Sequence, residues 1–103
     1  MEKELGSLKA SVVDFWAPWC VPCKRMLSVL EEVARESSEK YRGQIGFFRV
    51  NVDQESSLAQ KFEVMTVPTI LGFSGTVPLD RFNGKSKEDL QKWVDKLAER
   101  FGL

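Results

Sequence analysis

The sequence predicts an α/β fold built on a mixed sheet of about four strands. Two strongly apolar segments, residues 12–16 and 45–53, flank an amphipathic helical segment, and this order of elements favours a right-handed unit with two parallel strands. Further along, residues 69–73 and 77–82 flank a Ser-Gly pair that is typical of a hairpin turn, so these two strands are antiparallel. A parallel pair and an antiparallel pair together make a mixed sheet.

The composition indicates one globular domain, residues 1–103. Its 43% hydrophobic content is enough to bury a core without disulfide support. The 15 basic and 15 acidic side chains cancel, so we expect neither nucleic acid nor a membrane as a partner. The first four residues are too charged for a secretory signal, and no apolar run approaches the roughly 20 residues of a spanning helix. We therefore expect a soluble, cytoplasmic monomer.

The first predicted elements lead to the two cysteines of the chain. Residues 1–11 have loosely helical spacing and predict a short helix. Residues 12–16 form a nearly continuous apolar strand, as in strands covered on both faces. Pro22 is compatible with the first turn of the next helix because its missing N–H would have had no partner there. The apolar positions predicted to share one face of this helix are Met26, Leu27, Leu30, Val33 and Ala34.

The second half of the chain alternates strands and helices. Residues 37–38 and 42–43 predict a loop, and the strand 45–53 is followed by a short helix over 53–62. Pro78 cannot donate a ladder hydrogen bond, so the strand 77–82 is expected at a sheet edge. The last helix opens with a capping box, residues 86–89. Its predicted inward positions are Leu90, Trp93, Val94, Leu97 and Phe101.

Cys20 and Cys23 point to redox chemistry. They lie where an apolar strand passes into a helix, and the free N–H groups and positive dipole end of a first helical turn stabilise a thiolate. The alternatives are two buried cysteines acting as small hydrophobic side chains, or half of an intermolecular zinc site. Because the chain has no histidine, we expect no metal and no cofactor beyond a Cys20–Cys23 disulfide. Cys20 is the expected attacking thiolate and Cys23 the resolving thiol.

Three blocks of the sequence resemble the thioredoxin family. Residues 14–24, Asp-Phe-Trp-Ala-Pro-Trp-Cys-Val-Pro-Cys-Lys, resemble its active-site block, residues 50–53 the end of its central strand, and residues 67–69 its cis-proline segment. Gly84, before the last helix, also matches. The resemblance extends from residue 12 to about residue 100 at consistent spacing. It implies the thioredoxin-like fold, in which three layers are stacked as α/β/α.

The resemblance also assigns roles around the cysteines. A carboxylate among apolar neighbours is costly, and the resemblance makes Asp14 the buried acceptor of the proton that Cys23 loses. The alternative is an aspartate that only pairs with a nearby cation. A cis bond is implied at Val67–Pro68, which leaves the Val67 backbone free to pair with an extended substrate segment. The implied substrate-binding surface consists of Trp19, Val21, Pro22, Val67, Pro68 and Gly84.

Three features depart from the family pattern. Eleven residues before the first strand are too few for the strand and helix that the family places there, so we expect its N-terminal edge strand to be missing or truncated. Val21-Pro22 replaces the commonest Gly-Pro pair, and a valine there also occurs in membrane-anchored thioredoxin-like reductases. Arg49 stands where the family has a lysine near the buried aspartate.

The resemblance implies a thiol–disulfide oxidoreductase that reduces protein disulfides and is itself reduced again by a thioredoxin reductase. Two alternatives stay open. One is an extracytoplasmic thioredoxin-like reductase, for example in cytochrome maturation, whose anchor has been removed; Val21 favours it and the charged N-terminus opposes it. The other is a non-catalytic binding module with a thioredoxin fold. Replacing Cys20 by serine separates this last alternative, because a binding module would keep working.

Overall fold

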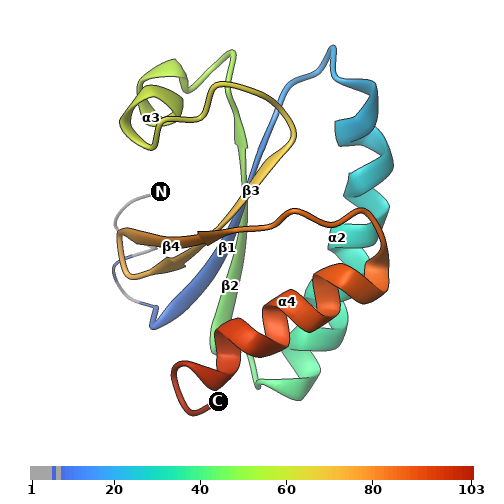
Figure 1. Cartoon of the computed structure of the whole chain (residues 1–103), viewed down its shortest axis with the longest axis vertical. Coiled ribbons are helices and arrows are strands. Elements are labelled where there is room, and N and C mark those ends of the chain that lie inside the picture. Colours follow the sequence, from blue (N-terminus) through green and yellow to red (C-terminus); the bar gives the residue numbers. More distant parts are fainter. Residues whose placement is uncertain (1–5, 7) are drawn as a thin grey trace.

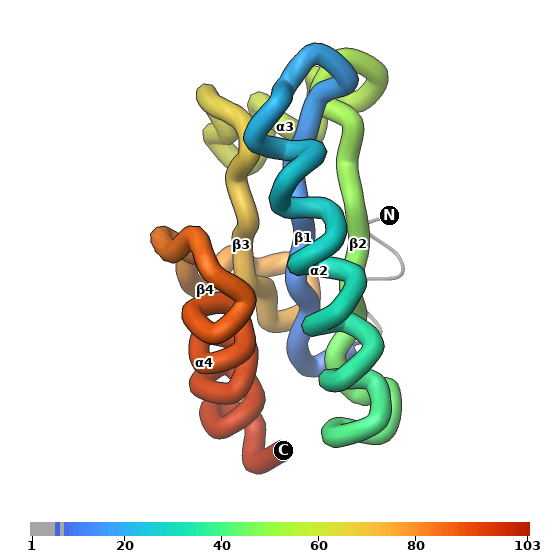
Figure 2. Tube along the Cα trace, turned by 90° about the vertical axis from the view of Figure 1, so that its right-hand side faces the viewer, coloured from blue at the N-terminus to red at the C-terminus, as the bar shows by residue number. Residues whose placement is uncertain are grey.

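Figure 1 shows the computed structural model, which describes residue 6 and residues 8–103. A mixed sheet of four strands in the order β2-β1-β3-β4 forms the middle layer. The strands are β1 (Ala10–Trp16), β2 (Ile45–Asn51), β3 (Thr69–Ser74) and β4 (Val77–Arg81). The helices are α2 (Val21–Lys40), α3 (Ser56–Lys61) and α4 (Lys87–Glu99). Helices α2 and α4 cover one face of the sheet and α3 covers the other, so the predicted three-layer fold is confirmed (Figures 1 and 2).

The two predicted strand pairings, the parallel pair and the hairpin, are confirmed, and the structure adds the pairing of β1 with β3. Strand β1 is parallel to β2 and antiparallel to β3, and β3 and β4 form the antiparallel hairpin. Strand β4, which contains Pro78, is an edge strand, where a missing N–H leaves no ladder partner unsatisfied. Strand β2 is the opposite edge, and no strand lies beyond it within the described residues. Within the described residues the sheet thus has four strands, the number predicted from the sequence.

Strand β1 divides the core into two halves because its side chains alternate between the faces of the sheet. Val12 packs with residues of α2 and α4, including Leu30 and Val94. Val13 and Phe15 point the other way and pack with the α3 side. Asp14 has the same parity as Val12, so its carboxylate lies on the α2 face of the sheet. The fold thus places a buried carboxylate beneath the helix that carries the cysteines.

Three sequence predictions need correction at element boundaries. The predicted loop at residues 37–38 is wrong, because α2 continues to Lys40 and Ser37 is buried in its inner face. Serine costs a helix interior only a few tenths of a kcal/mol relative to typical residues, so packing overrides its preference for loops. The helix predicted to start at residue 53 begins at Ser56. The first strand starts at Ala10 rather than at residue 12, and most of the helix predicted over residues 1–11 lies outside the described residues.

The ends of α2 and α4 show how local sequence stops and starts a helix. Arg42 and Gly43 adopt positive φ angles of 54° and 72°, which end α2 in the loop that was predicted there. At the start of α4, the Ser86 hydroxyl accepts a hydrogen bond from the Asp89 N–H at 3.0 Å, and Asp89 caps the Ser86 N–H in return. The predicted capping box is therefore confirmed. Within the described part of the chain, no helix is long and apolar enough to cross a membrane.

Candidate active site

The turn after β1 places Cys20 at the start of a helix. The Cys20 N–H donates to the Ala17 carbonyl at 3.1 Å, and Cys20 then serves as the N-cap of α2. Its sulfur accepts a hydrogen bond from the Cys23 N–H at 3.1 Å, one of the donors that a first helical turn leaves free. Pro22 occupies that first turn without removing an intrahelical bond, as predicted. The local sequence therefore directs N–H groups and the positive helix end at Cys20.

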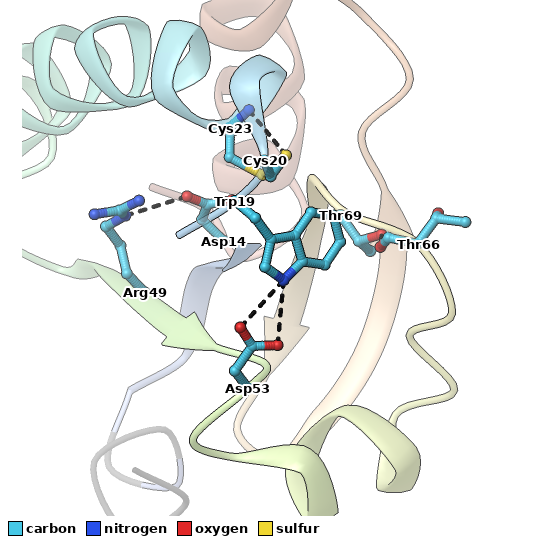
Figure 3. The surroundings of a disulfide bond; sticks show 8 residues. All are labelled: Asp14, Trp19, Cys20, Cys23, Arg49, Asp53, Thr66 and Thr69. Atoms are coloured by element: carbon cyan, nitrogen blue, oxygen red, sulfur yellow. Dashed lines mark hydrogen bonds and ion pairs between the residues drawn. A yellow bond between two sulfur atoms is a disulfide. The ribbon is translucent and has the colours of Figure 1, made fainter. Parts of the chain in front are cut away.

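Cys20 and Cys23 form a disulfide across the first turn of α2 (Figure 3). Their Cα atoms are 5.3 Å apart, a separation typical of disulfides. Both residues are buried, 4% exposed for Cys20 and 1% for Cys23, in a small apolar cluster with Ala17. Half-buried apolar side chains pack against this cluster, among them Val67. The site can therefore exist as a disulfide or a dithiol on one backbone scaffold.

The structure brings together most of the residues predicted to bind substrate. The Val67–Pro68 peptide bond is cis, as predicted. Pro22, Pro68 and Gly84 line one groove beside the disulfide, and Trp19 and Val67 line a smaller hollow beside it. Val21 lines neither, but it is 55% exposed at the start of α2. The predicted substrate-binding residues thus form two adjacent depressions and one exposed apolar position.

Two further residues of this surface were not found by sequence reasoning. Met65 is 93% exposed and lines the same hollow as Trp19. The Trp19 indole N–H donates to the Asp53 carboxylate, at 3.1 Å to Oδ2, which fixes the orientation of an exposed ring (Figure 3). The only sequence signal for Met65 was a large apolar residue three positions before Pro68. Asp53 was named only as the last residue of the 50–53 block that resembles the end of the family's central strand, with no role at the surface.

Asp14 is a buried carboxylate with a single cationic partner. It is 1% exposed, and in the sheet register it lies opposite Arg49 of β2. Arg49 Nε donates to Asp14 Oδ2 at 3.2 Å (Figure 3). The Arg49 guanidinium lies 4.3 Å from the centroid of the Trp16 ring. Asp14 Oδ1 has no hydrogen-bond partner among the described residues. Burial raises the pKa of Asp14, and the hydrogen bond and charge of Arg49 offset only part of this effect.

Gly84 is required by the close approach of the segment after β4 to the start of α4. A Cβ atom at this position would lie 2.6 Å from the Asp89 Cβ atom and 2.6 Å from the Phe82 ring, closer than carbon atoms can approach. A glycine therefore lets the segment after β4 pass close to the start of α4. This segment forms one wall of the groove beside Pro68. Within the part of the chain that the structure describes, no cluster of three His, Cys, Asp or Glu side chains could hold a metal ion.

Comparison with known proteins agrees with the fold and the cysteine pair. The thioredoxin family model matches residues 2–96. Thioredoxin from Staphylococcus aureus is 42% identical over 86 residues, which cover 82% of this chain and 79% of that protein. Among solved structures, thioredoxin from Malassezia sympodialis is 30% identical with a TM-score of 0.80, and covers 93% of this chain and 82% of its own.

A second solved structure leads to the same assignment. Oxidised thioredoxin from Plasmodium falciparum is 27% identical with a TM-score of 0.76, over 92% of this chain and 86% of its own. The family model covers far more than half of the chain, and the cysteine pair lies in the matched region. This chain therefore belongs to the thioredoxin family and is a thiol–disulfide oxidoreductase.

Proposed function

We propose that the chain reduces disulfide bonds of other proteins, with Cys20 as the attacking thiolate and Cys23 as the resolving thiol. The observation that carries this proposal is the disulfide across the first turn of α2, flanked by exposed apolar side chains. The N–H of Cys23 and the positive end of the 20-residue helix α2 are directed at the Cys20 sulfur. A thiolate is the reactive form of cysteine, so Cys20 is the favoured nucleophile.

The reaction proceeds through two exchanges. The Cys20 thiolate attacks one sulfur of the substrate disulfide, forms a mixed disulfide and releases the other substrate sulfur as a thiolate. Cys23 then loses its proton and attacks the Cys20 sulfur. This step forms the Cys20–Cys23 disulfide and releases the second substrate thiolate. The substrate gains two electrons, and the cysteine pair of this chain loses two.

Asp14 is the proposed acceptor of the Cys23 proton. Its carboxylate lies on the α2 face of the sheet, and Oδ1 has no hydrogen-bond partner in the described structure. Because burial raises the pKa of Asp14, the carboxylate accepts a proton more readily than an exposed aspartate does. Arg49 holds the other oxygen and so keeps the carboxylate in one orientation.

The substrate segment is proposed to bind across the disulfide in an extended conformation. Trp19, Val21 and Pro22 offer exposed apolar surface on the helix side. Val67, which packs against the cysteine cluster, offers its backbone on the other side, where Pro68 and Gly84 continue the surface. Pairing with the Val67 backbone would give affinity without requiring a particular substrate sequence.

We further propose that the chain acts as a monomer in the cytoplasm, in an electron-transfer chain, with a thioredoxin reductase as its donor. The bacterial relatives named thioredoxin support this assignment. A reducing compartment also keeps a dithiol ready to attack, as this activity requires. No cofactor beyond the Cys20–Cys23 pair is needed, because the two sulfurs carry both electrons.

Trapping of substrates tests this proposal. Cys23→Ser should attack substrates but not resolve them, so a model disulfide protein such as insulin should accumulate as a mixed disulfide on Cys20. Cys20→Ser should trap almost no substrate as a mixed disulfide. The same variant separates catalysis from simple binding, because a binding module would keep working without Cys20. Products are counted by non-reducing electrophoresis and mass spectrometry. Equal trapping by the two variants would contradict the assigned roles, and full activity of Cys20→Ser would contradict the proposed chemistry.

A further inference from the structure

The groove beside Pro68 is the largest depression next to the disulfide. Its volume is about 520 Å³, and it lies between the first three turns of α2 and the segment before α4. Pro22, between the two cysteines, lines it together with the apolar side chains of Met26 and Val29. A substrate segment that crosses the disulfide therefore enters this groove with the residues next to its cysteine.

Two cations border this groove from different elements. Arg25 is exposed on α2, and Lys85 is exposed just before α4. Neither side chain forms an ion pair with any described residue, in contrast to Lys87, whose Nζ lies 2.8 Å from Glu36 and 3.3 Å from Glu32. None of the described residues that line the groove is acidic. Its charge is therefore positive and not neutralised within the described chain.

The acidic residues closest in sequence are placed elsewhere. The Asp89 carboxylate accepts hydrogen bonds from the backbone N–H groups of Lys85 and Ser86, so it serves as a cap for α4. Glu88 is exposed in the first turn of α4 and does not line the groove. The Lys85 side chain is thus left available to a partner.

The other side of the disulfide has a different character. The hollow there has a volume of about 90 Å³ and no charged side chain in its lining, which includes Trp19 and Met65. A bound segment would therefore meet apolar surface on one side of its cysteine and two cations on the other. Resting on the proposed reductase activity, we propose that Arg25 and Lys85 select protein segments with aspartate or glutamate beside the disulfide cysteine.

Matched peptides test this selection. Each peptide carries one cysteine in a disulfide with the same chromogenic aromatic thiol, flanked on both sides by glutamate, glutamine or lysine. The reduced full-length chain should react fastest with the glutamate peptide, by about fivefold over the lysine peptide, since two exposed ion pairs each contribute a small stabilisation. The preference should shrink between about 0.02 M and about 0.5 M salt, because salt screens exposed charges.

Variants assign the effect to the two cations. The double variant Arg25→Gln/Lys85→Gln should lose most of the preference for the glutamate peptide. The control Lys9→Gln/Lys92→Gln removes two exposed positive charges that do not line the groove and should keep the preference. Equal rates for all three peptides with the wild-type chain, or an unchanged preference in Arg25→Gln/Lys85→Gln, would overturn this inference. Failure to react with any peptide would instead contradict the proposed reductase function.

Discussion

Trp19 and Val21, next to Cys20, expose more than half of their surface to solvent, whereas Asp14, on the sheet side of α2, is almost completely buried. The exposed side offers apolar surface and two depressions to a partner. The buried side offers one carboxylate, held by Arg49. If the proposed function is right, the difference teaches that recognition and proton transfer take place on opposite sides of one disulfide. Variants on the two sides should therefore affect different steps.

The largest effect is expected from Asp14→Asn. An amide cannot accept the Cys23 proton, so resolution of the mixed disulfide should slow by about tenfold or more near neutral pH. Formation of the mixed disulfide by Cys20 should change little, because that step occurs on the exposed side. Rapid quenching of a single turnover separates the two steps. An unchanged resolution rate would remove Asp14 from the mechanism.

A smaller effect on the opposite side is expected from Trp19→Ala. Loss of the exposed ring should lower kcat/KM for a protein disulfide by about fivefold, through lost apolar contact with the partner. Trp19→Phe is the matched control, since it keeps an aromatic ring and loses only the hydrogen bond to Asp53. The free energy of unfolding should change by less than about 0.5 kcal/mol in Trp19→Phe, because the bond is exposed. If Trp19→Ala instead slowed resolution, the division between the two sides would be wrong.

Arg49→Gln should shift the pH dependence of resolution. The Arg49 hydrogen bond and charge lower the pKa of Asp14, so their removal should raise that pKa further. The ionised carboxylate that accepts the proton would then be present only at higher pH. The midpoint of the resolution rate against pH should move upward relative to the wild-type chain. Arg49→Lys keeps the positive charge, so this variant should move the midpoint less. A downward shift of the midpoint in Arg49→Gln would contradict the assigned role of Arg49.

The smallest effect concerns stability. Because burial raises the pKa of Asp14 in the folded chain above the ordinary value of 3.8, folding favours the protonated form. This contribution to stability is fully present below about pH 3.8 and is lost as pH rises through the folded-state pKa. An asparagine at this position does not ionise, so Asp14→Asn does not lose stability as the pH rises. Its free energy of unfolding at pH 7 should therefore exceed that of the wild-type chain by about 1 kcal/mol. Urea unfolding of both proteins at several pH values measures the difference, which should narrow toward low pH.

The sequence predicted those features that depend on neighbouring residues. The position of Cys20 at the start of α2, the tolerance of Pro22 in its first turn and the capping box at Ser86 each follow from a few adjacent residues. The mixed character of the sheet also followed, because a strand-helix-strand unit gives a parallel pair and a hairpin gives an antiparallel pair. The pairing of β1 with β3, which joins these two units, was not predicted.

The features that the sequence missed depend on packing between distant segments. Helix α2 continues through Ser37 because the Ser37 side chain is buried in the core. The local preference of serine does not indicate this burial. Met65 and Asp53 reach the surface near Trp19 from segments more than 30 residues away in the chain. Arg25 and Lys85 are 60 positions apart and meet only where α2 passes the segment before α4.

The relative reactivity of the two thiols tests most directly that the two sides of the disulfide differ. The reduced wild-type chain is treated with limiting iodoacetamide at neutral pH, and the modified cysteine is identified by peptide mass spectrometry. Cys20 should be alkylated first, because its sulfur accepts the Cys23 N–H at the start of α2 and lies beside exposed side chains. Cys23 should be modified much more slowly, since it is 1% exposed on the side of Asp14. Equal labelling of the two cysteines, or faster labelling of Cys23, would contradict this account.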